Sequence, residues 1–241
     1  MTQNDIAAGV AELSRNLAAV RARMEAACHR AGRNPSDVRL LAVSKTVPAE
    51  RLRDAVAAGF RDFGENKVQE ASEKAAALAD VPGLRWSMIG HLQSNKARDV
   101  VGFASDFHAL DSIRLAEALD RRLRLTDRSL DVYVEVNTSG EPSKFGVPPG
   151  QVAELVAELP RFDRLRVVGL MTLAVNSTDE RAVRACFVRL RDLRDELRAV
   201  TPGLTELSMG MSGDFELAIE EGATVVRVGQ ALFGARATGP R

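Results

Sequence analysis

The sequence predicts a (β/α)8 barrel, and three observations support this fold class. Short runs rich in β-branched and aromatic residues alternate with longer stretches of helical spacing along almost the whole chain. Strict strand–helix alternation indicates a parallel sheet, and eight repeats within 241 residues indicate that the sheet closes on itself. No glycine-rich dinucleotide fingerprint follows the first run, which weighs against the alternative, an open doubly wound sheet.

An amphipathic helix is expected before the first strand, because apolar residues recur every three or four positions from Ile6 to Met24. We expect a single domain over residues 1–241, with this helix in 1–34 and the barrel in 39–234. No linker or repeat marks a second domain. The predicted strands are residues 39–45, 60–66, 84–90, 106–111, 130–137, 165–174, 206–211 and 224–229.

The segments between the strands have the spacing of helices, as in residues 49–59 and 112–125. The clearest is 177–200, in which Ser177 and Glu180 have the spacing of a capping box. We therefore expect one face of this helix to pack on the sheet. Its predicted apolar stripe is Val183, Phe187, Leu190, Leu193 and Leu197.

Composition and charge exclude several classes of protein. The formal net charge is zero and the pI is about 6.9, so nothing indicates a nucleic-acid or membrane-surface protein. No apolar run reaches the length of about 18 residues that a membrane span requires. Cys28 and Cys186 have no metal-like spacing and are expected to be reduced, buried thiols. We expect a cytoplasmic monomer.

Lys45 ends the first predicted strand in a chain that has 28 arginines and only five lysines. Burial at a strand end would lower the pKa of its amine and make the amine available for imine formation with a carbonyl. The alternative is a lysine satisfied by a buried carboxylate such as Glu135, and position alone does not decide between the two. Lys67, Lys96 and Lys144 are expected to be solvated or to line the mouth, and Lys74 to lie on a helix surface.

A second group of residues, around Ser212, predicts a phosphate site. Gly210 and Gly213 permit tight turns on either side of this hydroxyl, and a helix is expected to begin near Asp214. Gly229 and Gln230 follow the eighth strand in a similar arrangement, and barrels often bind phosphate between these two loops. The alternative is that Ser212 caps its helix and Gly229 only forms a turn. With Lys45 across the mouth, the pattern favours a ligand that has both a carbonyl and a phosphate.

The three histidines give weaker signals. His29 is expected on the surface of the first helix, and His108, within the fourth strand, as a hydrogen-bonded core histidine. His91 follows the third strand and is a candidate for a ligand contact. The chain has no HExxH motif and no Ser-His-Asp order.

Several longer motifs resemble the pyridoxal phosphate homeostasis proteins, barrels related to the N-terminal half of alanine racemase. The resemblance implies that Lys45 forms an internal aldimine with pyridoxal 5'-phosphate, that Asn66 lies beside the ring, and that Arg227 faces the pyridine nitrogen. It also implies that Ser212, Gly229 and Gln230 bind the phosphate, although the family usually has a small hydroxyl residue in place of Gln230. The matching motifs are "AVSKT", "FGENKVQEA", "IGHLQSNKAR", "VNTSGEPSKFGV", "GLMTLA" and "LSMGMSGDFELAIEEGATVVRVGQALFG".

The resemblance implies storage and delivery of pyridoxal phosphate, and through it vitamin B6 homeostasis, with PLP-dependent apo-enzymes as transient partners. The related racemases use a tyrosine from an additional domain, whereas the only tyrosine here, Tyr133, lies within a predicted strand. A cation at the pyridine nitrogen also weakens the cofactor as an electron sink. We therefore expect a non-catalytic binder. The alternatives are a weak amino-acid racemase and an aldolase that forms an imine with a phosphorylated substrate.

Overall fold

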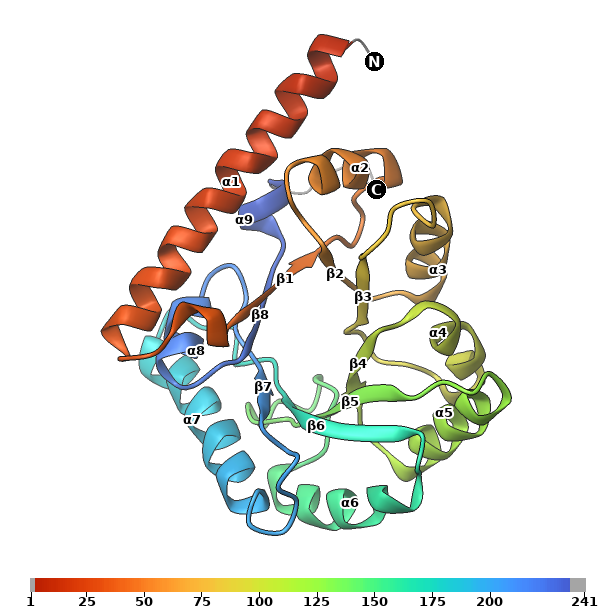
Figure 1. Ribbon diagram of the computed structural model, residues 1–241. Coiled ribbons are helices and arrows are strands. Elements are labelled where there is room, and N and C mark those ends of the chain that lie inside the picture. Colours follow the sequence, from red (N-terminus) through yellow and green to blue (C-terminus); the bar gives the residue numbers. More distant parts are fainter. Residues whose placement is uncertain (1–2, 235–241) are drawn as a thin grey trace.

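The computed structural model describes residues 3–234, and in this part of the chain eight parallel strands close into a barrel (Figure 1). The strands follow one another in chain order, and the last completes the ring by pairing with the first. The predicted fold class is confirmed, and each predicted strand is present. The strands are β1 (Arg39–Val43), β2 (Asp62–Glu65), β3 (Arg85–Met88), β4 (Asp106–Leu110), β5 (Leu130–Glu135), β6 (Leu165–Met171), β7 (Glu206–Ser208) and β8 (Val225–Val228).

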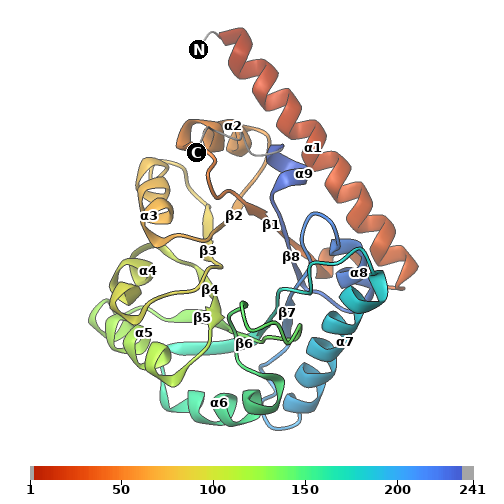
Figure 2. The same ribbon diagram turned by 180° about the vertical axis from the view of Figure 1, so that it is seen from behind.

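Helices form the outer layer around this barrel, and Figure 2 shows the same ring from behind. Short 3-10 turns lie at Pro35–Asp37, Ser94–Lys96, Pro149–Gln151 and Leu159–Arg161. The α-helices are α1 (Gln3–Arg30), α2 (Ala49–Ala57), α3 (Val68–Ala77), α4 (Ala97–Phe103), α5 (Ile113–Leu125), α6 (Val152–Glu158), α7 (Glu180–Leu197), α8 (Phe215–Glu220) and α9 (Gln230–Phe233).

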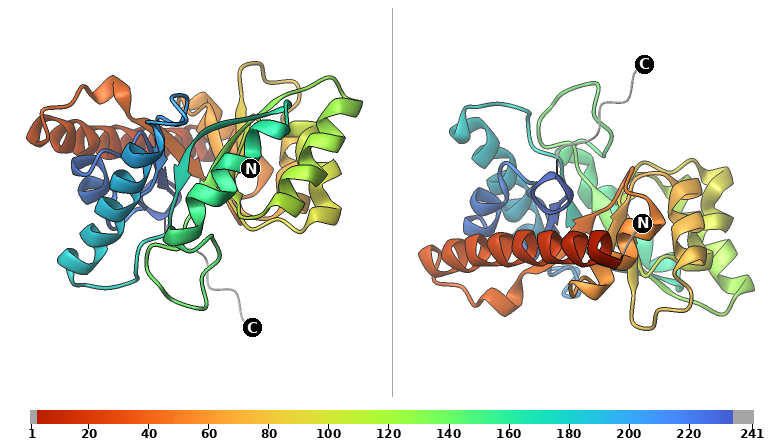
Figure 3. Two further views of the ribbon diagram at one scale, coloured as in Figure 1. Left: turned by 90° about the horizontal axis from the view of Figure 1, so that it is seen from below. Right: turned by 90° about the horizontal axis from the view of Figure 1, so that it is seen from above.

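Helix α1 lies outside the strand–helix repeat and packs along α2, α8 and α9 (Figure 3). Its buried stripe is the predicted one from Leu13 to Met24, but Ile6 is 41% exposed because the start of the helix projects beyond α2 (Figure 1). The helix ends at Arg30, earlier than the predicted residue 34. The single-domain assignment stays a prediction, and residues 235–241 lie outside the described part.

The predicted capping box of α7 is wrong. Asp179 is the N-cap residue, and its carboxylate accepts the backbone N–H of Arg181 at 2.9 Å. Ser177 lies further upstream, where its hydroxyl accepts the N–H of Asp179 at 3.0 Å. An aspartate at the helix start satisfies a free N–H group and adds a favourable charge, so it replaces the serine cap.

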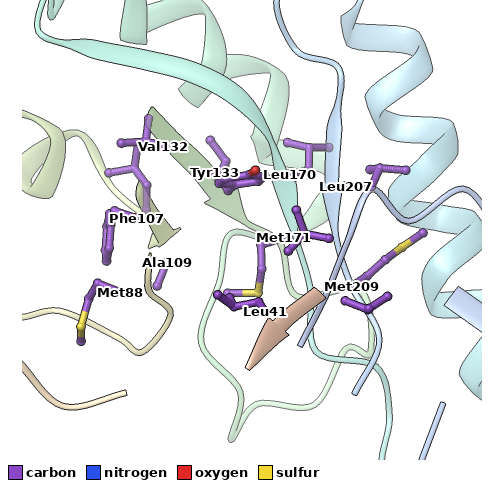
Figure 4. Close-up of a cluster of buried hydrophobic side chains, with 14 of the residues drawn as sticks. Leu41, Met88, Phe107, Ala109, Val132, Tyr133, Leu170, Met171, Leu207 and Met209 are labelled. Carbon is purple, nitrogen blue, oxygen red and sulfur yellow. The ribbon is translucent and has the colours of Figure 1, made fainter. Parts of the chain in front are cut away.

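Buried side chains from β1, β3, β4, β5, β6 and β7 form much of the core (Figure 4). Successive residues of each strand alternate between the barrel interior and the helical layer. The buried rings of Phe63 and Trp86 pack at a tilt against each other, with centroids 5.3 Å apart. The interior of the barrel also contains polar side chains, and these belong to the candidate functional site.

Candidate functional site

The turn after β1 carries Lys45. The backbone N–H of Val47 donates to the carbonyl of Ser44 at 2.9 Å, and this bond closes a β-turn with Lys45 and Thr46 at its central positions. Thr46 has a φ of 67°, a left-handed conformation that costs an L-residue about 1–2 kcal/mol. Lys45 is half-buried at the carboxyl end of the barrel.

Strand alternation directs Lys45 toward the barrel interior. Leu41 is the register partner of Arg227, whose side chain reaches residues across the inside of the barrel. Ser44 points the other way, because its hydroxyl donates to Glu65 at 2.7 Å on the side of α3. The next residue, Lys45, therefore starts on the interior side.

Lys74 is buried, at 5% exposure, and the prediction that it decorates a helix surface is wrong. Its ammonium donates to the carbonyl of Ser44 at 2.7 Å, to Glu65 Oε1 at 2.7 Å and to Glu70 Oε1 at 2.6 Å. Burial raises the pKa of Glu65, although the hydrogen bond from Lys74 opposes the rise. Burial would also raise the pKa of Glu70, but the hydrogen bonds from Lys74 and from the Thr46 N–H outweigh it and lower that pKa. This cluster lies directly behind the Lys45 turn.

Two neighbouring loops meet at Ser212, as the sequence predicted. The Ser212 hydroxyl accepts the backbone N–H groups of Gly229 and Ala231 at 3.3 and 3.5 Å. Ser212 is not the cap of α8, because Asp214 occupies that position and its carboxylate accepts the N–H of Met211 at 2.5 Å. The hydroxyl and the two N–H groups thus form one cluster of hydrogen-bonding groups between the loops after β7 and β8. The expectation that Lys45 lies across the mouth from this cluster is wrong. The first and last strands of the closed barrel are neighbours, so the Lys45 turn lies beside the loop after β8.

Gly210 shapes the first of these loops. Its φ is 91°, which favours glycine, and an added Cβ would lie 2.6 Å from Cβ of Ala218. A side chain here would push the loop away from α8. The close approach therefore fixes the path that brings Ser212 to the loop after β8.

Arg227 lies inside the barrel and is 3% exposed. Its guanidinium donates to the hydroxyl of Ser208 and to the carbonyl of Thr172, both at 2.7 Å. Burial lowers the pKa of Arg227 to about 10, although Asp214 and Glu135 favour its charged form. The group still carries its positive charge at neutral pH.

A chain of hydrogen bonds continues from Ser208 through the barrel interior. His108 contacts the Ser208 hydroxyl through Nδ1 at 2.8 Å and Asp106 through Nε2 at 3.0 Å, and Asp106 accepts from Arg39 at 2.8 Å. Burial lowers the pKa of His108, which favours the neutral ring. The Asp106 carboxylate can only accept, so the neutral ring carries its proton on Nε2 and donates it to Asp106, and Nδ1 accepts from the Ser208 hydroxyl. His108 is a hydrogen-bonded core histidine, as expected.

Asn66 and Gln230 differ in the burial of their side chains. The Asn66 side-chain oxygen is buried and has no hydrogen-bond partner within residues 3–234. Its backbone is fixed by Gly90, where an added Cβ would lie 2.2 Å from the Asn66 carbonyl oxygen. Gln230 begins α9 with an exposed side chain, so it can contribute its backbone N–H more readily than its amide.

Glu135 is a buried group in the mouth that the sequence identified only as a possible partner for Lys45. It follows Tyr133 on the interior side of β5 and is 4% exposed. Burial, together with the nearby charge of Asp111, raises the pKa of Glu135 to about 7, while Arg227 opposes the rise. Its position two residues after an interior tyrosine is the sequence signal that could have placed it in the site.

The other candidates at the mouth have local partners. Lys144 donates to the carbonyl of Ala174 at 2.7 Å and contacts Glu141 at 3.2 Å. His91 lies 3.1 Å from Asp111, and its ring stacks on Phe145 with centroids 4.1 Å apart. A ligand contact by His91 stays a prediction. The remaining two predicted mouth lysines, Lys67 and Lys96, are exposed.

A family model for the alanine racemase N-terminal domain matches residues 15–237. Relatives from Pseudomonas aeruginosa, Aquifex aeolicus and Escherichia coli, each named pyridoxal phosphate homeostasis protein, are 46%, 44% and 40% identical to this chain. The matches cover 91–93% of this chain and 96–97% of those proteins. The chain belongs to the pyridoxal phosphate homeostasis protein family.

Solved structures agree with this family assignment. PipY of Synechococcus elongatus, in a structure with PLP bound, is 39% identical and has a TM-score of 0.81, with 92% of this chain and 100% of that chain covered. Alanine racemase of Clostridium difficile has a TM-score of 0.75 at 14% identity, covering 94% of this chain and 57% of that one. The second likeness shows the shared barrel fold.

Residues 3–234 contain neither a candidate membrane span nor a candidate metal site. None of the described helices is long and apolar enough to cross a membrane. The described His, Cys, Asp and Glu side chains include no group of three or more that could bind a metal ion.

The raised pKa of Glu135 predicts how the stability of the ligand-free protein depends on pH. Its pKa is raised from 4.5 to about 7, so the folded state binds more protons than the unfolded state between these values. Stability must then fall as the pH rises through this window, by about 3 kcal/mol for this one group. Urea unfolding of Glu135→Gln from pH 4.5 to 7.5 should show a smaller loss of stability than the parent protein shows.

Glu154→Gln is the matched control, because Glu154 is an exposed carboxylate on α6. Its stability should change with pH as that of the parent protein does. If Glu135→Gln and the parent lose stability in parallel over the window, Glu135 does not titrate there as described.

Proposed function

We propose that this chain is a non-catalytic pyridoxal 5'-phosphate-binding protein that acts in the homeostasis of PLP and vitamin B6. The observation that carries the proposal is the pairing of β1 with β8. This pairing brings the Lys45 turn, the interior cation Arg227 and the loop at Gly229 to one side of the barrel mouth. The names of the curated relatives and the PLP-bound PipY structure support the same ligand.

The residues present fit this cofactor. Pyridoxal phosphate supplies an aldehyde, which a lysine amine can bind covalently as an imine, and a phosphate that backbone N–H groups can bind. Lys45 is the interior lysine of the mouth, and the N–H groups of Gly229 and Ala231 converge on the Ser212 hydroxyl. Asn66 presents a buried oxygen that lacks a protein partner in the described chain.

Each residue then has a distinct role in binding. Lys45 holds the cofactor covalently, and Asn66 lies beside its ring. Ser212 and Gly229 bind the phosphate through a hydroxyl and a backbone N–H, and Gln230 contributes its N–H rather than its exposed amide. These donors are set by loops whose paths are fixed by close packing at Gly210 and at Gly229, whose Cβ position is 3.0 Å from the carbonyl oxygen of Val43.

The electrostatics of the site support binding without turnover. Arg227 is held by Ser208 and Thr172 and keeps its positive charge at neutral pH. A guanidinium at the pyridine nitrogen disfavours a proton there, so the ring is a poor electron sink. The Tyr133 ring packs at a tilt against His108 inside the barrel, with ring centroids 4.0 Å apart. Burial raises the pKa of the Tyr133 hydroxyl, so it is a poor acid or base for the mouth.

Delivery of the cofactor in the cytoplasm, by a monomer that contacts PLP-dependent apo-enzymes transiently, is the proposed cellular role. Exposed apolar side chains around the mouth support such contacts. Phe145, Leu173 and Met211 lie on the loops after β5, β6 and β7 and are 57%, 37% and 41% exposed. Exposed apolar side chains gathered at one end of a protein are typical of interaction surfaces.

The lysine assignment predicts the behaviour of Lys45→Ala. The parent protein mixed with pyridoxal phosphate should show the visible absorption band of an imine and should be trapped by borohydride. Lys45→Ala should lose both the band and the trapping, because the alanine has no amine. Absorption spectra and mass spectrometry of the intact protein measure the two effects.

Lys96→Ala, which removes an exposed lysine of the mouth, should keep both signals. Retention of both signals by Lys45→Ala would assign the imine to another lysine, with Lys144 the next candidate. Lack of a band in the parent protein, combined with borohydride trapping by a phosphorylated sugar, would favour the aldolase alternative.

The non-catalytic assignment predicts no enzyme-like turnover of amino acids. L-amino acids are tested one by one with the protein that has pyridoxal phosphate bound. Each should lose optical rotation no faster than it does in a solution of free pyridoxal phosphate. Chiral chromatography checks the result. A Lys45-dependent loss of optical rotation that is abolished by Glu135→Gln would identify a racemase that uses Glu135 as its acid–base group.

A further inference from the structure

Lys74 is a buried cation that the binding of the cofactor does not use directly. It projects from α3 into the space between this helix and the barrel wall, on the opposite side of the wall from the mouth interior. Its three N–H groups meet three acceptors, on Ser44, Glu65 and Glu70, at 2.6–2.7 Å. Burial of a lysine destabilises the folded state unless its ammonium is fully paired, and here all three N–H groups have acceptors.

The hydrogen bonds of Lys74 and Glu70 reach the residues on both sides of Lys45 in the chain. Lys74 binds the carbonyl of Ser44, the residue before Lys45. It also binds Glu70 Oε1, which accepts the backbone N–H of Thr46, the residue after Lys45, at 2.5 Å. The turn is thus held at its start and at its third residue by one ammonium group and one carboxylate.

The turn needs such support because of Thr46. A turn with φ > 0 at this position normally has glycine there, whereas this chain places a β-branched residue at 67°. Strained backbone persists only where surrounding contacts impose it. The bond from Thr46 to Glu70, with Glu70 fixed by Lys74, is such a contact.

We propose that Lys74 is a positioning residue for Lys45, and that it holds the Lys45 turn in the conformation that directs the amine into the barrel. The inference rests on the proposed function, in which Lys45 binds the cofactor. Lys74 acts through the backbone, from behind the barrel wall, without contacting the ligand. An ammonium suits the task because it is compact and has three donors for three acceptors, whereas a planar guanidinium is larger and has a different donor geometry.

The test compares Lys74→Met with the parent protein at a temperature where circular dichroism shows that both are folded. We expect the dissociation constant for pyridoxal phosphate to rise about tenfold or more, the scale typical of outer-shell partners of a ligating group. We also expect a smaller fraction of the protein to be trapped by borohydride at saturating cofactor. Lost stability alone would not change the trapped fraction of a folded, saturated protein.

Thr46→Gly provides the rescue experiment, because glycine adopts the left-handed conformation without steric cost. Added to Lys74→Met, it should restore much of the trapped fraction. Lys96→Met is the matched control and should behave as the parent does. If Lys74→Met does not fold, Glu70→Ala takes its place, because it frees the Thr46 N–H but leaves Lys74 bonded to Ser44 and Glu65; it should also bind more weakly and be rescued by Thr46→Gly.

The outcomes separate the inference from the proposed function. Parent-like affinity and trapping in a folded Lys74→Met, or in Glu70→Ala where that variant is used, would overturn the positioning role. So would a loss of binding that Thr46→Gly leaves unchanged. If the parent protein itself forms no Lys45-dependent imine, the proposed function fails as well.

Discussion

Barrel closure between β1 and β8 is the constraint on which the site depends. The two strands are separated by most of the chain, yet four residue pairs from Arg39↔Val225 to Ala42↔Val228 lock them side by side. This register places the turn after β1 beside the loop after β8. A parallel barrel directs every such loop to the same end, so the lysine and the proposed phosphate donors meet without any long insertion.

The interior of the barrel sets the charge of the site. Arg227 is connected through Ser208 and His108 to Asp106, and Asp106 is paired with Arg39 near the opposite end of the barrel. A neutral His108 with defined donors and acceptors leaves the guanidinium little freedom to turn. We infer that this chain of bonds keeps a fixed cation where the family pattern places the pyridine nitrogen. The same fixed cation is the physical reason for proposing storage rather than turnover.

Local sequence patterns predicted the strand order and the Lys45 and Ser212 positions, because alternation of strands and helices determines which loops share the mouth. They missed the environment of Lys74. An alanine-rich sequence with charged residues is typical of a solvent-exposed helix. Lys74, however, lies three residues after Ala71 and four before Leu78, so it shares the buried face of the helix with these two residues. Burial of a lysine there also depends on Glu65, a strand residue nine positions earlier, and single-segment periodicity does not report such a pairing.

The capping error at α7 has a similar origin. Ser177 and Glu180 have the correct spacing for a capping box, but Asp179 is an equally good cap two residues later, and its extended backbone lets its carboxylate accept the N–H of Arg181. The Glu135 carboxyl was hard to assign for another reason. Its raised pKa comes from burial and from Asp111, which belongs to the loop after β4 and becomes a neighbour only in the closed barrel.

The central claim is that one lysine, Lys45, holds pyridoxal phosphate covalently in this barrel. Peptide mapping of the parent protein tests it most directly, after incubation with the cofactor, borohydride reduction and proteolysis. The account predicts a single stoichiometric pyridoxyl adduct on the peptide that contains Lys45. Labelling of Lys144 or of the exposed lysines in its place, with an unmodified Lys45 peptide, would contradict the account.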